Sequence, residues 1–489
     1  MSFVSWNFIL LFLPATLIGF HAIRGDAAAR WRALLLIGAS ILFYGLSGLQ
    51  NLAVAGASAL ANPAFALLLL RKEGLSERAR SVILWAAIAF NIGLLGFFKI
   101  EAVAATGPDG FRVAESILIP LGLSYITFQQ IGFVVAAWRR QFVGFGLRDY
   151  LFFITFFPKL AMGPITPYRE IEGQLADGAL ARTGSGDIAV GLAIFLFGLA
   201  QKLLLADQIA PSLDRIFLAA QHAPITPAES WFAIIAFQLQ LYFDFVAYTD
   251  MAIGLGRMFG IRLPINFDRP LTAVDRFDLW RRWHISFAIF MRNHVFFPLA
   301  KRRHVPMAGA LAATGILSGL WHGLGWTFVL WGLVQTIILL VAHEKRRRAR
   351  RHGAPSLLRR IAAIALTFLV SALIGGLFRS PTLESAGHIY GALTGFVALP
   401  DAGSLLDRRA FIMLPLCALV AWGLPNSAQF FGRLWNAIDL RPKAPPPPVY
   451  PLRALHFAVN RRWAMIMALL LVVCLLLIED GRRFVYVQF

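Results

Sequence analysis

Long apolar runs separated by short polar gaps extend along the whole chain of 489 residues. A helix needs roughly 20 predominantly apolar residues to cross the hydrocarbon core of a membrane. Runs suited to such helices occupy about residues 3–20, 32–50, 51–70, 81–99, 116–138, 187–205, 229–248, 360–378, 410–424 and 463–478, and a longer run covers 305–342. The pattern predicts an all-α, polytopic integral membrane protein with about 11 to 13 membrane helices. We expect a single domain over residues 1–489.

Composition and charge agree with a membrane protein. Hydrophobic residues make up 58% of the chain and charged residues 15%, and the net charge is +20. A charge of this size could indicate nucleic-acid binding, but the basic residues lie in the gaps between apolar runs. That arrangement fixes membrane topology and attracts anionic lipid headgroups, so lipids and not nucleic acid are the expected partners. Both cysteines, Cys417 and Cys474, lie in apolar runs, so we expect neither a disulfide nor a metal site there.

Basic residues mark every second gap in the first part of the chain. They are Arg24, Arg30 and Arg32, then Arg71, Lys72, Arg78 and Arg80, then Arg139, Arg140 and Arg148. The positive-inside rule places these gaps in the cytoplasm and the N-terminus outside it. The first apolar run has no basic residue before Arg24, so we expect it to be retained as a span and not cleaved as a signal peptide.

Two segments break the pattern of simple spans. Residues 150–165 are aromatic but short and interrupted by prolines, so we expect a re-entrant or interfacial segment. Further along, Thr272 and Asp275 are spaced as a capping box that opens a helix. Its apolar positions recur in steps of three and four at Phe277, Trp280, His284, Phe287 and Met291. This stripe predicts an amphipathic helix at the cytoplasmic interface with His284 on the buried side.

Two tryptophan–histidine pairs, Trp283-His284 and Trp321-His322, are the candidates for chemistry. Between Val305 and Ala342 there is no Lys, Arg, Asp or Glu, so His322 is the readily titratable group of a long apolar run. An ionisable side chain at membrane depth is costly, which favours a functional role. Glycines at 319, 323 and 325 predict a break at His322 between two crossings that form a hairpin.

An ordered series of motifs resembles the membrane-bound O-acyltransferase superfamily. The series is Phe157-Pro158-Lys159, Gly163-Pro164-Ile165, Tyr242-Phe243-Asp244-Phe245, Pro264-x-Asn266-Phe267, Trp280-Arg281-Arg282-Trp283-His284-Ile285-Ser286 and Ser318-Gly319-Leu320-Trp321-His322-Gly323. It is most similar to the bacterial branch that contains the alginate O-acetylation and teichoic-acid D-alanylation membrane proteins. The resemblance covers about residues 1–345, with the core motifs at about 115–345. The helices at about 355–489 are less characteristic.

The resemblance implies helices around a central funnel, with a tunnel from the cytoplasmic side of a bacterial inner membrane. An acyl group from acetyl-CoA or an acyl-carrier thioester would pass to a hydroxyl of an extracytoplasmic polysaccharide, with no tightly bound cofactor. The implied partners are a periplasmic acetyltransferase, a polysaccharide synthase and a cytoplasmic acyl donor protein. The family's invariant histidine falls on His322 and a second frequent histidine on His284. Arg292-Asn293-His294 stands where relatives usually have Arg-Asp-Tyr, which leaves donor and acceptor open.

The chemistry of acyl transfer supports a catalytic role for His322. The acceptor hydroxyl loses a proton as it attacks, and a neutral imidazole is the usual base. Trp321 and Trp326 are expected to exclude water. The alternatives are an imidazole that only bonds a backbone carbonyl at the helix break, or a base that activates Ser318, four residues earlier, as a nucleophile.

The supporting residues each have a structural alternative. His284 and Trp283 orient donor or acceptor, or merely pack. Arg281 and Arg282 hold donor phosphates or serve as topological anchors. Asp244 and Asp250 position helices or a histidine, and Asn266 caps a turn. For the whole protein, the alternatives to O-acetyl transfer are D-alanyl or longer-acyl transfer, or a polar-solute transporter with His322 as a proton relay.

Overall fold

The computed structural model describes residues 1–71, 74–302, 304–349, 356–395, 404–432, 456–478 and 484, and for 105–118 and 347–349 it describes the backbone alone. Across these residues the chain forms helices and no strands, which confirms the all-α prediction. Six of the described helices are long and apolar enough to cross a membrane, and several shorter helices are also apolar. The protein is therefore a multi-pass membrane protein.

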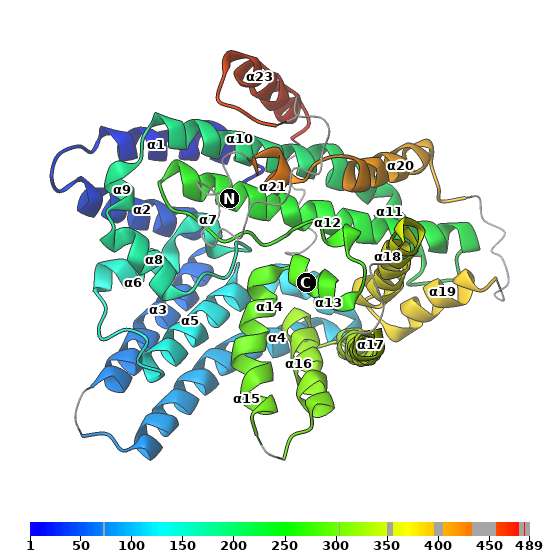
Figure 1. The fold of residues 1–489 in the computed structure, drawn as a ribbon, viewed down its shortest axis with the longest axis horizontal. Coiled ribbons are helices and arrows are strands. Elements are labelled where there is room, and N and C mark those ends of the chain that lie inside the picture. Colours follow the sequence, from blue (N-terminus) through cyan, green and yellow to red (C-terminus); the bar gives the residue numbers. More distant parts are fainter. Residues whose placement is uncertain are drawn as a thin grey trace.

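The described helices are labelled in chain order in Figure 1. The first are η1 (Asn7–Phe12), α1 (Leu13–Ala22), α2 (Ala28–Gly45), α3 (Leu49–Leu70), α4 (Glu77–Leu118), α5 (Leu123–Trp138), α6 (Leu147–Thr155) and α7 (Phe157–Leu160). The next are α8 (Tyr168–Ala176), α9 (Ala179–Arg182), α10 (Ser185–Gln201), η2 (Lys202–Ala206), α11 (Asp207–Ala219), α12 (Pro227–Met258), η3 (Pro270–Thr272), α13 (Arg276–Arg282), α14 (Ile285–Met291), η4 (Arg292–Phe296) and α15 (Phe297–Ala300). The last are α16 (Met307–His322), α17 (Trp326–Ala349), α18 (Leu357–Arg379), α19 (Leu383–Leu393), α20 (Arg408–Gly423), α21 (Ser427–Phe430) and α23 (Arg461–Leu476).

Helix α12 is the central element of the fold, with α10 running along it (Figure 1). In its most apolar 18-residue window, 89% of the residues are buried, which is expected of a helix that is apolar on all sides. Glycines allow the two backbones to meet. A Cβ at Gly191 would lie 2.5 Å from the carbonyl oxygen of Gly254, and a Cβ at Gly198 would lie 2.6 Å from that of Ala247. Gln238 and Leu241 of α12 line the cavity described below.

Helices α16 and α17 form the hairpin expected around His322. Helix α16 ends at His322, and the chain turns through Gly323 in an extended conformation before α17 begins at Trp326. The two helices are in backbone contact, since a Cβ at Gly315 would lie 2.6 Å from the carbonyl oxygen of Gly332. Small residues thus bring the two helices together.

The structure corrects the prediction of one amphipathic helix from Thr272. Two short helices, α13 and α14, replace it, and they are broken at His284, whose φ is 44°. The cap is also different, because the side chain of Asp275 accepts the N–H of Asp278 and opens α13, while Thr272 ends the short turn η3. The aromatic segment 150–165 lies inside the protein, where Phe152, Phe153, Phe156 and Phe157 are at most 1% exposed.

Candidate active site

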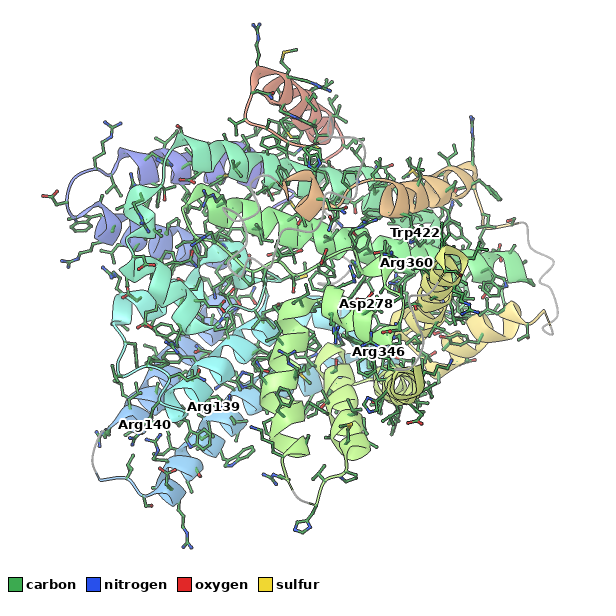
Figure 2. All side chains as sticks on the ribbon, in the orientation of Figure 1. Arg139, Arg140, Asp278, Arg346, Arg360 and Trp422 are labelled. Carbon is green, nitrogen blue, oxygen red and sulfur yellow. The ribbon has the colours of Figure 1, made fainter. Side chains whose placement is uncertain are left out.

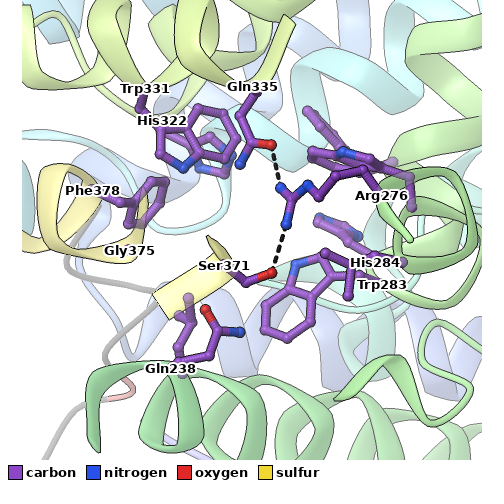
Figure 3. Close-up of a pocket in the computed structure, with 14 residues that line it drawn as sticks. Gln238, Arg276, Trp283, His284, His322, Trp331, Gln335, Ser371, Gly375 and Phe378 are labelled. Atoms are coloured by element: carbon purple, nitrogen blue, oxygen red, sulfur yellow. Dashed lines mark hydrogen bonds between the residues drawn. The ribbon is translucent and has the colours of Figure 1, made fainter. Parts of the chain in front are cut away.

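A cavity of about 70 Å³ lies among α12, α13, α14, α16, α17 and α18 (Figure 3). Both candidate histidines line it: His284 from the junction of α13 and α14, and His322 from the end of α16. Trp283 lines it as well. A cavity of this size holds a few water molecules, so it has room for a reacting group.

His322 is buried and surrounded by aromatic rings. Its side chain is 6% exposed, and its ring centroid lies 4.9 Å from that of Phe378 and 5.5 Å from that of Trp331. The end of α16 is held from α4, where the buried Lys99 ammonium donates to the carbonyl oxygens of Trp321 at 2.6 Å and His322 at 3.3 Å. These are carbonyls that a helix terminus leaves without intrahelical partners. Lys99 therefore fixes the backbone that carries the imidazole.

His284 occupies a strained backbone position that another segment holds in place. A positive φ in a residue other than glycine is uncommon and costs of order 1–3 kcal/mol. Asn266 compensates: its backbone oxygen accepts the N–H of Ile285 at 2.9 Å, and its side-chain oxygen accepts the N–H of Ser286 at 3.0 Å and the Ser286 hydroxyl at 2.9 Å. Asn266 thus stabilises the break between α13 and α14.

The same side chain defines the tautomer of His284. Because a backbone N–H can only donate, its bond to Asn266 identifies the accepting atom as Oδ1. That oxygen also lies 3.3 Å from Nδ1 of His284, so Nδ1 carries the proton and donates. Nε2 of His284 is then the atom with the lone pair.

The two histidines are linked through aromatic contacts. The ring centroid of Phe287 lies 4.9 Å from that of His284 and 5.9 Å from that of His322. Trp321 supports this ring from behind, stacking on Phe287 at 4.7 Å and contacting Tyr125 at 5.6 Å. The structure therefore brings together His284, His322 and both tryptophans of the Trp-His pairs.

Of the two tryptophans expected to exclude water, Trp321 is buried, with its ring centroid 4.6 Å from that of His322. Trp326 is 70% exposed, so the expectation that it shields His322 is wrong. Trp331 and Phe378 also lie against the His322 ring (Figure 3). Ser318 is buried, but its hydroxyl has no hydrogen-bond partner among the described residues, so the structure contains no Ser318–His322 hydrogen bond.

The predicted arginines and aspartates lie outside the cavity. Arg281 is exposed, and Arg282 pairs with Asp278 at 2.9 Å. Asp278 lies on the side of the molecule formed by α13 and α17, away from Arg139 and Arg140 (Figure 2).

Asp244 pairs with Lys202 at 2.6 Å. Lys202 also pairs with Asp207 at 2.8 Å. Asp250 bonds to Gln201 and Ser427. These acids connect helices and do not contact a histidine through any of these bonds.

Sequence reasoning missed a polar cluster on the cavity wall. Arg276 donates to Ser371 at 2.6 Å and to Gln335, and Gln238 lies nearby (Figure 3). Arg276 looks like one more basic residue of a charged segment, while Gln335 and Ser371 are isolated polar residues in apolar runs. Only the packing of α13 against α17 and α18 brings them together, so the local pattern contained no signal for them.

Comparison with known proteins agrees with this geometry. The profile of the membrane-bound O-acyltransferase family matches residues 133–378, a range that includes every residue lining the cavity. The chain belongs to the membrane-bound O-acyltransferase family. It is thus an O-acyltransferase of the membrane, and the resemblance of its motifs is confirmed.

Similarity to individual relatives extends over most of the chain. It is 31% identical to the peptidoglycan O-acetyltransferase of Helicobacter pylori over 87% of this chain and 89% of the relative. It is also 31% identical to the probable alginate O-acetylase of Azotobacter vinelandii, over 88% of this chain and 86% of the relative. Similarity to the teichoic acid D-alanyltransferase of Bacillus subtilis is 26% over 53% of this chain and 69% of the relative.

Proposed function

We propose that this O-acyltransferase moves an acetyl group from a cytoplasmic thioester, acetyl-CoA or an acyl carrier, to a hydroxyl of an extracytoplasmic polysaccharide. The observation that carries the proposal is that His284 and His322 line the same small cavity. A volume of about 70 Å³ accommodates an acetyl group. The relatives that match over most of the chain are named as O-acetylating enzymes, whereas the D-alanyltransferase matches over about half of it.

In the proposed mechanism His322 is the general base. Its imidazole takes the proton of the acceptor hydroxyl as that oxygen attacks the thioester carbonyl. The new C–O bond forms and the C–S bond breaks. His322 returns the proton to the thiolate, which leaves as the free thiol. General-base catalysis of this kind contributes about 10²–10⁴-fold. Trp331 and Phe378 exclude water that would otherwise hydrolyse the thioester.

His284 orients the acceptor. Asn266 accepts its Nδ1–H, and Nε2, the nitrogen with the lone pair, would accept the hydrogen bond of a substrate hydroxyl. Trp321 contacts both imidazoles, with its ring centroid 6.3 Å from that of His284 and 4.6 Å from that of His322, while Trp283 packs on Phe267 at 5.2 Å. Arg281 and Arg282 lie outside the cavity and act as topological anchors in this proposal, with the basic gaps in the cytoplasm and the N-terminus in the periplasm. A periplasmic acetyltransferase, a polysaccharide synthase and a cytoplasmic donor protein are the partners we propose.

The test is acetyl transfer by the purified full-length protein. His322→Ala should lower transfer from acetyl-CoA to an oligosaccharide by about 10²–10⁴-fold. His304→Ala is the matched control, since His304 is exposed and follows the basic residues after α15. Unchanged transfer in folded His322→Ala would overturn the role of His322. A wild-type protein that leaves every thioester donor intact would instead favour a transporter.

A further inference from the structure

Arg276 is a buried cation beside the reacting groups. Its side chain lines the cavity with both histidines and is 5% exposed. Arginine stays protonated in proteins. Among the described residues, no carboxylate pairs with it, and its two hydrogen-bond partners, Ser371 and Gln335, are neutral. The neighbouring Asp275 is engaged elsewhere, with Arg346 at 2.7 Å. The positive charge of Arg276 therefore lacks a counter-charge within the described part of the chain.

Burying a cation without a counter-charge is unfavourable, because neutral hydrogen bonds replace only part of its hydration. A role that only ties α13 to α17 and α18 would not need a charge, since an amide or hydroxyl makes the same bonds. The position of the charge on the cavity wall points instead to an anion that enters with the substrate.

Two donors on this wall are still unused. The Nε–H of Arg276 is buried and has no hydrogen-bond partner among the described residues, and the same holds for the Nε1–H of Trp280. The two residues are four apart on α13, so they share a face of the helix, and both line the cavity. A guanidinium presents five N–H donors in a planar fork that matches a carboxylate. The cavity volume of about 70 Å³ is sufficient for such a group.

We propose that Arg276 and Trp280 form a carboxylate subsite in the acyl-transfer cavity, so that the enzyme selects a substrate that carries a carboxylate near its reacting atoms. This inference rests on the proposed function, because it assigns part of the same cavity. The carboxylate has two chemical sources. It belongs either to the acceptor sugar, as in a uronic acid, or to the transferred group, as in the half-thioester of a dicarboxylic acid.

A binding experiment tests the subsite without catalysis. Sodium glucuronate and sodium succinate should each raise the thermal unfolding midpoint of the purified full-length protein, because a ligand that binds the folded state stabilises it. Glucose should not. Arg276→Gln keeps hydrogen-bonding capacity but removes the charge, and should abolish the shift. Arg215→Gln is the control, since it removes the same charge from a residue that is 51% exposed and does not line the cavity. Equal shifts in wild type and Arg276→Gln would overturn the subsite.

Transfer assays identify the source of the carboxylate. One arm compares uronate-containing with neutral oligosaccharides and acetyl-CoA as donor, and the other compares succinyl-CoA with acetyl-CoA on a neutral oligosaccharide. Arg276→Gln should lower transfer about 10–100-fold for the pair that carries the carboxylate, as expected for the loss of a charge-assisted hydrogen bond. The neutral pair should change little. The comparison in which Arg276→Gln lowers transfer selectively identifies the source of the carboxylate.

The remaining outcomes separate this inference from the proposed function. Equal losses for acidic and neutral pairs would overturn the subsite while transfer itself stands. Wild-type protein without turnover on any pair would count against the proposed function, and the thermal shifts would still decide the subsite. Trp280→Phe keeps the ring but removes the Nε1–H. It should lower selectivity for the acidic substrate several-fold even if Arg276→Gln does not fold.

Discussion

The side-chain oxygen of Asn266 lies 3.3 Å from Nδ1 of His284, and the same oxygen holds the backbone just after the histidine. One amide from a separate segment therefore sets both the tautomer of His284 and the strained turn that points it into the cavity. Asn266 is a positioning residue: it acts on substrate only through His284.

Asn266→Ala should lower kcat about 10–100-fold, since hydrogen-bonded supports of this kind are worth that much in other sites, while KM for the donor changes little. The measurement is a double-mutant cycle with His284→Ala. Because Asn266 acts through His284, the double variant should be no slower than His284→Ala alone. Fully additive losses would show that Asn266 contributes independently of the histidine.

The aromatic wall around His322 should control the fate of the thioester. Phe378→Ala removes the ring 4.9 Å from the imidazole and opens the cavity to water. We expect hydrolysis of acetyl-CoA to rise relative to transfer, with both products measured in the same reaction.

Phe368→Ala is the matched control for this wall. It removes a ring from the same helix, α18, but Phe368 packs on Trp422 at 4.9 Å and does not line the cavity. The ratio of hydrolysis to transfer should stay at the wild-type value in this variant. An equal rise in both variants would mean that a loosened α18, and not the wall, admits water.

The close approach of α16 and α17 should be intolerant of a single methyl group. In Gly315→Ala, the new Cβ would lie 2.6 Å from the carbonyl oxygen of Gly332, so the helices must separate. Overpacking typically costs about 1–3 kcal/mol, and here it also displaces His322 at the end of α16. Both the unfolding midpoint and transfer should fall. Gly309→Ala lies on the same helix, where a Cβ meets nothing closer than 3.6 Å, and should leave both unchanged or raise stability slightly.

The sequence was sufficient to predict the break at His322 and the hairpin of α16 and α17. Those features depend on local glycines and on an uninterrupted apolar run, which are visible along the chain. The break at His284 was not predictable in this way. Its stripe of apolar residues fits a continuous helix, and the turn exists because Asn266, 18 residues earlier, bonds across it.

The partners of the charged residues were also not predictable from the local sequence. Asp244 stood out as an acid in an apolar run, but its partner Lys202 lies 42 residues away and was not identified. Arg276 stood among other basic residues and looked like part of the topology signal. Whether a charge pairs, stays exposed or faces a cavity depends on which helices pack together, and that information is not local.

The Lys202–Asp244 pair joins the π-helical turn η2 to the central helix α12, and both side chains are 0% exposed. Removing one partner of a buried ion pair typically costs about 3–5 kcal/mol, and Asp207, whose carboxylate lies 2.8 Å from the same ammonium, offsets part of that loss. Asp244→Ala should therefore unfold at much lower temperature or denaturant concentration than wild type. Asp214→Ala is the control, since Asp214 is 56% exposed in its pair with Arg379 and should cost at most about 1 kcal/mol.

Activity per folded molecule distinguishes a structural role of Asp244 from a catalytic one. Because Asp244 lies outside the cavity, any folded fraction of Asp244→Ala should transfer acetyl groups at the wild-type rate per active molecule. The double change Lys202→Met with Asp244→Leu leaves one acid, Asp207, at this contact, whereas Lys202→Met alone leaves two, so the double variant should be less destabilised than Lys202→Met. Its activity per folded molecule, measured after size-exclusion chromatography, should match wild type. A large loss of kcat in a fully folded double variant would instead place this pair in the chemistry.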